Sequence, residues 1–227
     1  MPGLAAVDGL VLKQPVAESY RAGLSKNVSV IISNMAQECG AGPGATMPAA
    51  PSAFKAELAK LLAFTKANVC EVLDVYKTEL SAYEAHGHQR VYDSMTADAE
   101  VGCGNKMLAL ALAGGRKPFA SPPVFSVVNS IGSEAPPFAC HVSDLNSVMH
   151  GKDAAAVQLR VDWVEFASSG TVKRWMPVLT PAGPASTILF SNYSATVAPT
   201  VCVDCKWRQC ALWAKTLPPA PAFWWSN

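Results

Sequence analysis

The sequence predicts a mixed α/β fold, and three observations lead to that prediction. Runs of strand length occur at residues 27–33, 122–130 and 186–191. The stretches between them carry apolar residues at helical spacing. The first two runs are apolar almost throughout, which is typical of strands covered on both faces of a mostly parallel sheet. Because two or three strands make only the flank of a sheet, we expect an incomplete, mostly parallel sheet flanked by helices.

The elements before the helical region are short. A turn at Asp8-Gly9 leads into a short apolar strand and then a helix over about residues 16–22. The first buried strand, "NVSVIIS", follows. A loop rich in glycine and proline, "GAGPGATMPAAPSA", separates this strand from the helices.

Helical periodicity dominates the middle of the chain. Residues 51–80 predict one or two helices, and residues 96–115 a further helix that stops at Gly114-Gly115. The apolar residues that set the first pattern are Phe54, Leu58, Leu61, Leu62, Phe64, Val69, Val72, Leu73 and Tyr76.

The second half continues the alternation of strands and helices. The buried strand "PPVFSVVNS" precedes a short helix, "SDLNSVMHG", with Ser143 as its N-cap. An amphipathic helix over residues 154–170 ends at Gly170. The tail holds the strand-like "STILFS", the helical "CKWRQCALWAKTL" and a proline-rich end.

The composition indicates a piece of a larger folded body. Hydrophobic residues make up 50% of the 227 residues and charged residues 15%, with a mean hydropathy of +0.19. This is too apolar for a disordered chain and poor in surface charge for a self-contained domain. The net charge of +1 gives no electrostatic basis for binding nucleic acid or an anionic membrane. Apolar runs such as "KMLALALAGG" are too short to span a bilayer.

The cysteines favour an oxidising compartment. There are seven, and the odd number leaves at least one thiol unpaired or bonded elsewhere. Glycosylation sequons at Asn27 and Asn192 fit a secreted glycoprotein. The N-terminus lacks the basic and apolar regions of a signal peptide. We therefore expect a protein of the secretory pathway or the extracellular space, whose start lies upstream.

Two titratable side chains follow the predicted buried strands. Glu38 comes just after the first strand, and His141 lies on a loop after the second. Catalytic groups of open α/β sheets gather at the carboxyl ends of the strands. Taken singly, Glu38 is interpreted as a solvated loop residue and His141 as a structural one. Cys140 and His150 lie near His141 in the sequence, but their spacing matches no metal-site pattern, and we expect no cofactor.

Five stretches change this interpretation when they are taken in order: "AAVDGLVLKQPVAESYRAGLSKNVSVIIS", "IISNMAQECG", "HVSDLNSVMHG", "WVEFASSGTVKRWMPV" and "QCALWAKTLPP". Together they resemble the C-terminal part of the type-B carboxylesterase and cholinesterase family of α/β-hydrolases. The third is similar to the family block H-x-x-[DE]-L-x-x-V-F-G, and the fourth to W-x-x-F-A-x-x-G-x-P…W-P. The resemblance runs from about residue 5 to 219, so residues 1–227 are interpreted as the C-terminal part of one hydrolase domain.

The resemblance implies a catalytic role for both titratable side chains. Glu38 would be the acid of a Ser-Glu-His triad, and His141 the base, in hydrolysis of a small carboxylic ester. The 103 residues that separate them suit the hydrolase order of serine, acid and then histidine. Cys39 stands where the family has a glycine after the acid, and Met149 where it has phenylalanine. The closing glycine of the histidine block falls on His150, and Gly151 comes one residue late.

The nucleophile that the resemblance requires is absent from these residues. No serine lies in a G-x-S-x-G elbow: Ser130 in "VNSIG" lacks the first glycine, and Ser169 in "SSGTV" fits no better. There is no "HGGG" oxyanion segment either. We therefore expect the missing N-terminal part of the fold to be the partner that supplies the serine, and the isolated chain to be inactive.

The resemblance also implies a disulfide between Cys103 and Cys210, against the alternative of two buried thiols. Cys202 and Cys205 form a C-x-x-C that fits a redox pair, half a zinc site or a local disulfide. Three functional hypotheses follow: the acid and base of an esterase, a cholinesterase-like module that binds or adheres without chemistry, and a thiol or metal protein built on these cysteines.

Overall fold

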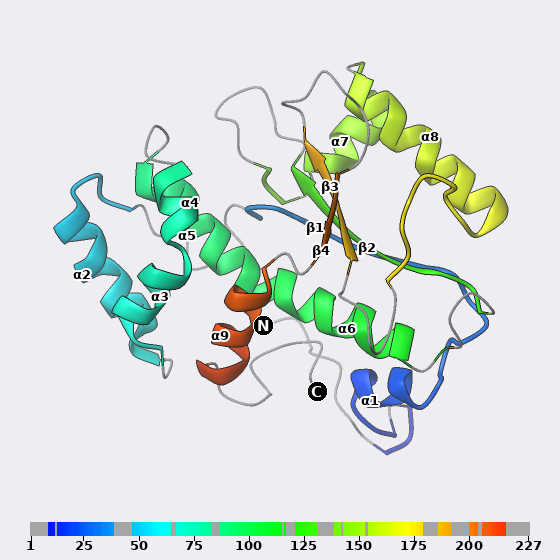
Figure 1. Cartoon of the computed structure of the whole chain (residues 1–227), viewed down its shortest axis with the longest axis horizontal. Coiled ribbons are helices and arrows are strands. Elements are labelled where there is room, and N and C mark those ends of the chain that lie inside the picture. The colour runs from blue at the N-terminus through cyan, green and yellow to red at the C-terminus, as the bar shows by residue number, and fades with distance from the viewer. Residues whose placement is uncertain are drawn as a thin grey trace.

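The computed structural model of the chain describes residues 9–11, 13–38, 47–64, 67–82, 87–114, 116, 121–130, 139–141, 143–152, 154–178, 186–191, 200–203 and 206–216. Within them, helices pack around one sheet, so the mixed α/β prediction is confirmed (Figure 1). The four strands are β1 (Val30–Met35), β2 (Val124–Ser130), β3 (Ser186–Ser191) and β4 (Thr200–Val203).

The sheet is mostly parallel, with the order β1-β2-β3-β4. β1 pairs in parallel with β2, from Val30 opposite Val124 to Met35 opposite Asn129. β2 and β3 are also parallel, whereas β4 runs antiparallel to β3. The strands predicted at residues 27–33, 122–130 and 186–191 are therefore present. β4 was not predicted, because its four residues are too few to show a period.

The described helices lie on both sides of this sheet. They are α1 (Val16–Arg21), α2 (Pro51–Leu61), α3 (Val69–Val75), α4 (Lys77–Ala82), α5 (Gly87–Ala97), α6 (Cys103–Gly114), α7 (Ser143–His150), α8 (Ala154–Ser169) and α9 (Trp207–Thr216). A π-helical turn, η3 (Asp98–Gly102), joins α5 to α6, and a 3₁₀ turn, η1 (Leu62–Phe64), follows α2. Figure 1 shows α6 on one side of the sheet and α8 on the other.

The strands alternate their side chains between these two helices. Phe125 and Val127 of β2 pack with Leu159 of α8, and the cluster includes Val172 and Trp175. Val124 of the same strand faces the opposite way and packs with Leu112 of α6. β1 follows the same alternation, because Ile31 joins the first cluster and Val30 and Ile32 join the second. Burial on both faces explains why these strands are apolar almost throughout.

Three predictions about single elements are wrong. The apolar strand expected after Asp8-Gly9 is not formed in its described residues: Leu10 and Val11 lie in bends and are 82% and 86% exposed, whereas a strand is stabilised by the packing of its side chains. The described residues of the region 51–80 form α2, α3 and the start of α4, not one or two helices, since the chain turns at Tyr76 between α3 and α4. α7 begins at Ser143, so this serine is inside the helix and is not its N-cap.

α8 has the predicted extent, but its buried and exposed faces are not the predicted ones. It ends before Gly170, whose φ of +72° is the left-handed conformation that favours glycine after a helix. The buried face carries Asp162, which pairs with Arg174 and accepts a hydrogen bond from the Trp175 ring nitrogen at 3.0 Å. Three valines of the helix are exposed instead: Val157, Val161 and Val164. The simple amphipathic pattern is therefore wrong.

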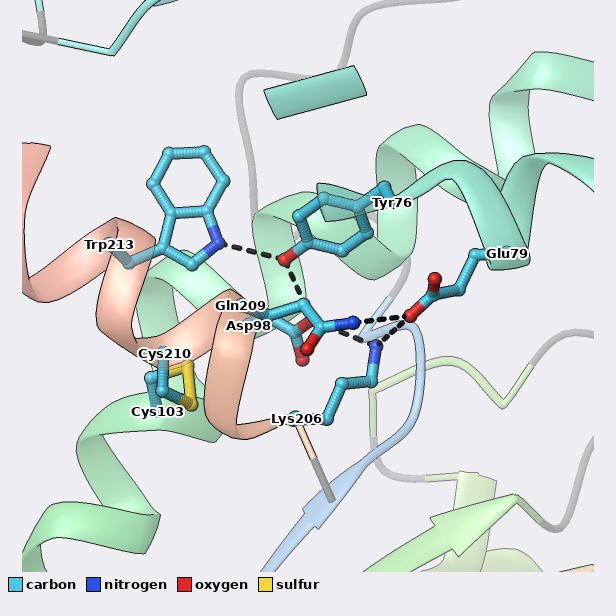
Figure 2. The surroundings of a disulfide bond; sticks show 8 residues. All are labelled: Tyr76, Glu79, Asp98, Cys103, Lys206, Gln209, Cys210 and Trp213. Atoms are coloured by element: carbon cyan, nitrogen blue, oxygen red, sulfur yellow. Dashed lines mark hydrogen bonds and ion pairs between the residues drawn. A yellow bond between two sulfur atoms is a disulfide. The ribbon is translucent and has the colours of Figure 1, made fainter. Parts of the chain in front are cut away.

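The predicted disulfide between Cys103 and Cys210 is confirmed. It joins the first residue of α6 to α9, with 5.1 Å between the two Cα atoms. Beside it, the buried Tyr76 hydroxyl donates to Asp98 and accepts from the Trp213 ring nitrogen, both at 2.8 Å (Figure 2). Lys206 reaches Asp98 at 2.8 Å, so α9 is fixed by a covalent bond and a polar network together.

The remaining cysteines and sequons have these positions. Cys140 and Cys202 are disulfide-bonded, and Cys70 is an exposed free thiol. Asn27 lies exposed in the turn before β1, whereas Asn192, Cys39 and Cys205 lie outside the described residues. Among the helices that the structure describes, none combines the length and apolar character needed to cross a bilayer.

Candidate functional site

The candidate site lies where β1 and β2 end. Because these strands are parallel and Met35 is paired with Asn129, their carboxyl ends meet at one edge of the sheet. Glu38 lies three residues beyond the last residue of β1. His141 lies on the loop that enters α7. The fold therefore brings together two residues that are 103 positions apart in the sequence.

Glu38 and His141 contact each other directly. The Glu38 Oε2 atom lies 2.7 Å from the His141 Nδ1 atom. The Glu38 side chain is 4% exposed, whereas that of His141 is 69% exposed. The second carboxylate oxygen, Oε1, accepts a hydrogen bond from the Met35 backbone N–H at 2.6 Å. Both oxygens of the buried carboxylate are thus engaged, and the imidazole it holds remains open to solvent.

This contact fixes which nitrogen of His141 can accept a proton. A carboxylate oxygen only accepts hydrogen bonds, so the short contact requires the hydrogen on Nδ1. Nε2 is then the basic atom of the neutral ring. When Nε2 takes a proton, the buried carboxylate stabilises the positive ring beside it. This arrangement allows Nε2 to take up a proton while Nδ1 stays hydrogen-bonded to the carboxylate.

The backbone at Glu38 takes a conformation that side chains rarely adopt. Its φ is +50°, in the left-handed region that usually belongs to glycine. This turn lets the Glu38 backbone N–H donate to the Ala139 carbonyl at 3.1 Å while its side chain reaches His141. Non-glycine residues in this region are frequent where a functional group must be held in place.

A second polar contact ties the start of α7 to the sheet. Asn129, fully buried on β2, donates from its amide to Asp144 Oδ2 at 3.0 Å. The Asn129 backbone carbonyl also accepts from the Ala36 backbone N–H at 2.9 Å. Asp144 lies in the first turn of α7, just after the His141 loop. Asn129 therefore links the ends of β1 and β2 to the helix that follows the histidine.

Neither Ser169 nor the metal alternatives fit the site. Ser169 lies at the end of α8, where its hydroxyl bonds the Glu165 and Thr171 carbonyls. Cys140 is already in a disulfide, so it offers no thiolate to a metal next to His141. Cys202 is oxidised in the same way, which contradicts the half zinc site. Within the described ranges, no three histidine, cysteine or acidic side chains are placed to hold a metal ion.

Two buried polar residues of the site were not identified from the sequence. Gln37 and Asn129 are 4% and 0% exposed, and both bond the segment that carries His141 or follows it. The available signal was their position, since each stands at or just beyond the end of a predicted strand. Polar residues at strand ends are usually solvated, so position alone did not single them out.

Comparison with known proteins adds no family assignment. No protein-family model matches the chain, and no curated protein sequence is significantly similar to it.

Proposed function

We propose that Glu38 and His141 are the acid and the base of a serine-type carboxylic ester hydrolase, of the kind represented by the type-B carboxylesterases and cholinesterases. The observation that carries the proposal is the 2.7 Å contact between the buried Glu38 carboxylate and Nδ1 of the exposed His141. In this proposal the sheet is the C-terminal flank of an α/β-hydrolase fold. The serine and the oxyanion hole come from polypeptide outside these 227 residues.

The mechanism uses the imidazole twice. His141 Nε2 removes the proton of the serine hydroxyl as its oxygen attacks the ester carbonyl, and it returns that proton to the departing alcohol. In the second half, Nε2 takes a proton from water, which attacks the acyl-enzyme, and returns that proton to the serine oxygen as the acid is released. Throughout, Glu38 holds the ring through Nδ1 and stabilises its positive form.

The oxidised cysteines support a secretory location in the same proposal. Cys103 and Cys210 form a bond that spans 107 residues, and Cys140 and Cys202 are also in disulfides. Such bonds persist in oxidising compartments and are rare in the cytosol. The exposed Asn27 sequon is compatible with glycosylation there.

The test is reconstitution of the enzyme with a complementing segment. The chain alone should not hydrolyse p-nitrophenyl acetate, and a polypeptide that bears a G-x-S-x-G elbow, co-expressed with it, should restore turnover. In the restored enzyme, His141→Ala should lower kcat by about 10⁴-fold or more, and Glu38→Gln by about 10³- to 10⁴-fold. Stopped assays of p-nitrophenol release measure both.

His150→Ala is the matched control, because this exposed histidine ends the same helix α7 and bonds neither Glu38 nor the sheet in the described contacts. It should leave kcat unchanged. A reconstituted enzyme that kept full activity after His141→Ala would refute the assignment of the base. A native complementing segment with glycine or alanine in place of the elbow serine would instead favour the non-catalytic binding module.

A further inference from the structure

We infer that Gln37 is a positioning residue that sets the geometry of the Glu38–His141 contact. The inference depends on the proposed function only for its catalytic consequence. The side chain of Gln37 is buried beside the acid, with 4% of the residue exposed. Its Oε1 atom accepts a hydrogen bond from the Ala139 backbone N–H at 2.9 Å. Ala139 precedes His141 by two residues.

The two segments are joined at one residue by several hydrogen bonds. The Ala139 carbonyl accepts from the Gln37 backbone N–H at 3.3 Å and from the Glu38 backbone N–H at 3.1 Å. Both polar groups of the Ala139 peptide backbone are therefore bonded to the segment that carries the acid. Ala139 itself is 1% exposed, so these bonds are shielded from water. Loss of any one of them would leave a buried polar group without a partner, which destabilises the fold.

The exposure of His141 explains why such a connection is needed. With 69% of its side chain open to solvent, the imidazole has little packing to hold it against the carboxylate. The position of the ring then depends on the backbone that carries it. Gln37 fixes that backbone two residues away, and its Nε2 contacts the Ser94 hydroxyl of α5 at 3.5 Å, which anchors the amide on a helix.

The variant that tests the inference is Gln37→Met, which keeps the length of the side chain and removes its acceptor. The readout is the low-field proton resonance of the His141 Nδ1–H in the full chain, assigned by ¹⁵N-histidine labelling and by its loss in His141→Ala. We expect the wild-type resonance to weaken and shift upfield in Gln37→Met, with exchange with solvent about tenfold faster. Should this variant fail to fold, Gln37→Asn keeps a buried amide that is one methylene too short for Ala139.

Gln89→Met is the matched control. Gln89 also accepts a backbone N–H through its Oε1, from Met47 at 2.8 Å, but it lies on α5 and its amide donates to Asp93 of the same helix at 3.0 Å. Its variant should lose comparable stability in thermal unfolding and keep the wild-type resonance. An unchanged resonance in Gln37→Met, or an equal loss in Gln89→Met, would overturn the inference.

The outcome is separable from that of the proposed function. In the reconstituted esterase, Gln37→Met should lower kcat and leave KM nearly unchanged, because the ester is bound by other parts of the fold. If the resonance responds to Gln37 but no complementing segment restores turnover, Gln37 positions His141 and the esterase proposal fails. If turnover is restored and the resonance is the same in Gln37→Met as in the wild type, the esterase proposal stands and this inference fails.

Discussion

At the scale of single residues, the acid of the site depends on an unfavourable backbone conformation. Glu38 takes a φ of +50°, and its two side-chain oxygens and its backbone N–H are all hydrogen-bonded. A left-handed conformation at a non-glycine residue has a cost of about 1–3 kcal/mol. The bonds that Glu38 makes to Met35, Ala139 and His141 are the interactions available to offset that cost.

The carboxyl group of Glu100 should govern part of the pH dependence of stability. Partial burial in η3 raises the pKa of Glu100 from 4.5 to about 7. Between these values the folded chain holds a proton that the unfolded chain has released, so the free energy of unfolding falls as the pH rises. Glu100→Gln removes this titration. We expect the melting temperatures of the variant and the wild type to be similar near pH 4 and the variant to be the more stable near pH 8.

Glu18→Gln, at an exposed position of α1, is the control for removing one negative charge. It should shift the melting temperature little at any pH. A constant difference between Glu100→Gln and the wild type across this pH range, measured by calorimetry, would show that Glu100 titrates normally in the folded chain.

The contact between Glu38 and His141 could be anticipated from the sequence. The buried polar residues that hold the two segments together, Gln37 and Asn129, could not. The anticipation came from the order of five motifs, since each residue alone has a commoner structural explanation. Gln37 and Asn129 give no such signal, because a polar residue after a strand looks the same whether it is solvated or buried. The burial of Gln37 depends on the Ala139 segment, which comes about a hundred positions later in the chain.

At the scale of elements, α9 is held by both a disulfide and a polar network (Figure 2). Burial and the neighbouring Asp98 raise the pKa of Tyr76 well above its usual value, so its hydroxyl remains a donor at any physiological pH. Removal of the disulfide frees a loop of 107 residues in the unfolded chain. Replacing Cys103 and Cys210 by alanine should therefore lower the free energy of unfolding by about 4–5 kcal/mol.

Urea unfolding of the chain measures that change. Cys70→Ala, which removes the exposed free thiol, is the control and should unfold at the wild-type urea concentration. Even without the disulfide, we expect α9 to stay docked, because the Tyr76 hydroxyl bridges Trp213 and Asp98. A loss below about 1 kcal/mol would mean that the unfolded chain is already compact around this bond.

Element types were easier to predict than the face that each element buries. β1 and β2 lie where their β-branched runs indicated, because burial on both faces leaves a continuous apolar signal. α8 shows the opposite case: its end at Gly170 followed from the sequence, but its faces did not. The ion pair of Asp162 and Arg174 places a charged side chain on the buried face, and no periodicity of apolar residues can reveal such a pair.

At the scale of the whole molecule, α7 and α8 contact each other and present apolar side chains to solvent. Leu145 and Met149 of α7, and Val157, Val161 and Val164 of α8, are each 44% to 64% exposed. With a net charge of only +1, little electrostatic repulsion keeps copies of the chain apart. We expect the isolated chain to self-associate, and Val161→Lys to shift the population towards monomer in light scattering.

Ala167→Lys adds the same charge to an exposed position of α8 outside the valine row. It should change the association much less than Val161→Lys does. Equal effects of the two variants would assign the change to net charge alone and not to the apolar surface of α7 and α8.

The pairing of Glu38 with His141 inside one chain has a consequence for assembly. On the proposed function, an incoming segment contributes the hydroxyl, the oxyanion donors and the ester-binding surface, whereas the proton acceptor is already oriented. Activity would then start as soon as the two parts dock, and the rate of product formation would be proportional to the number of assembled enzyme molecules. The lag before turnover would be set by the association of the chain with the complementing segment, and not by a later rearrangement of the catalytic residues.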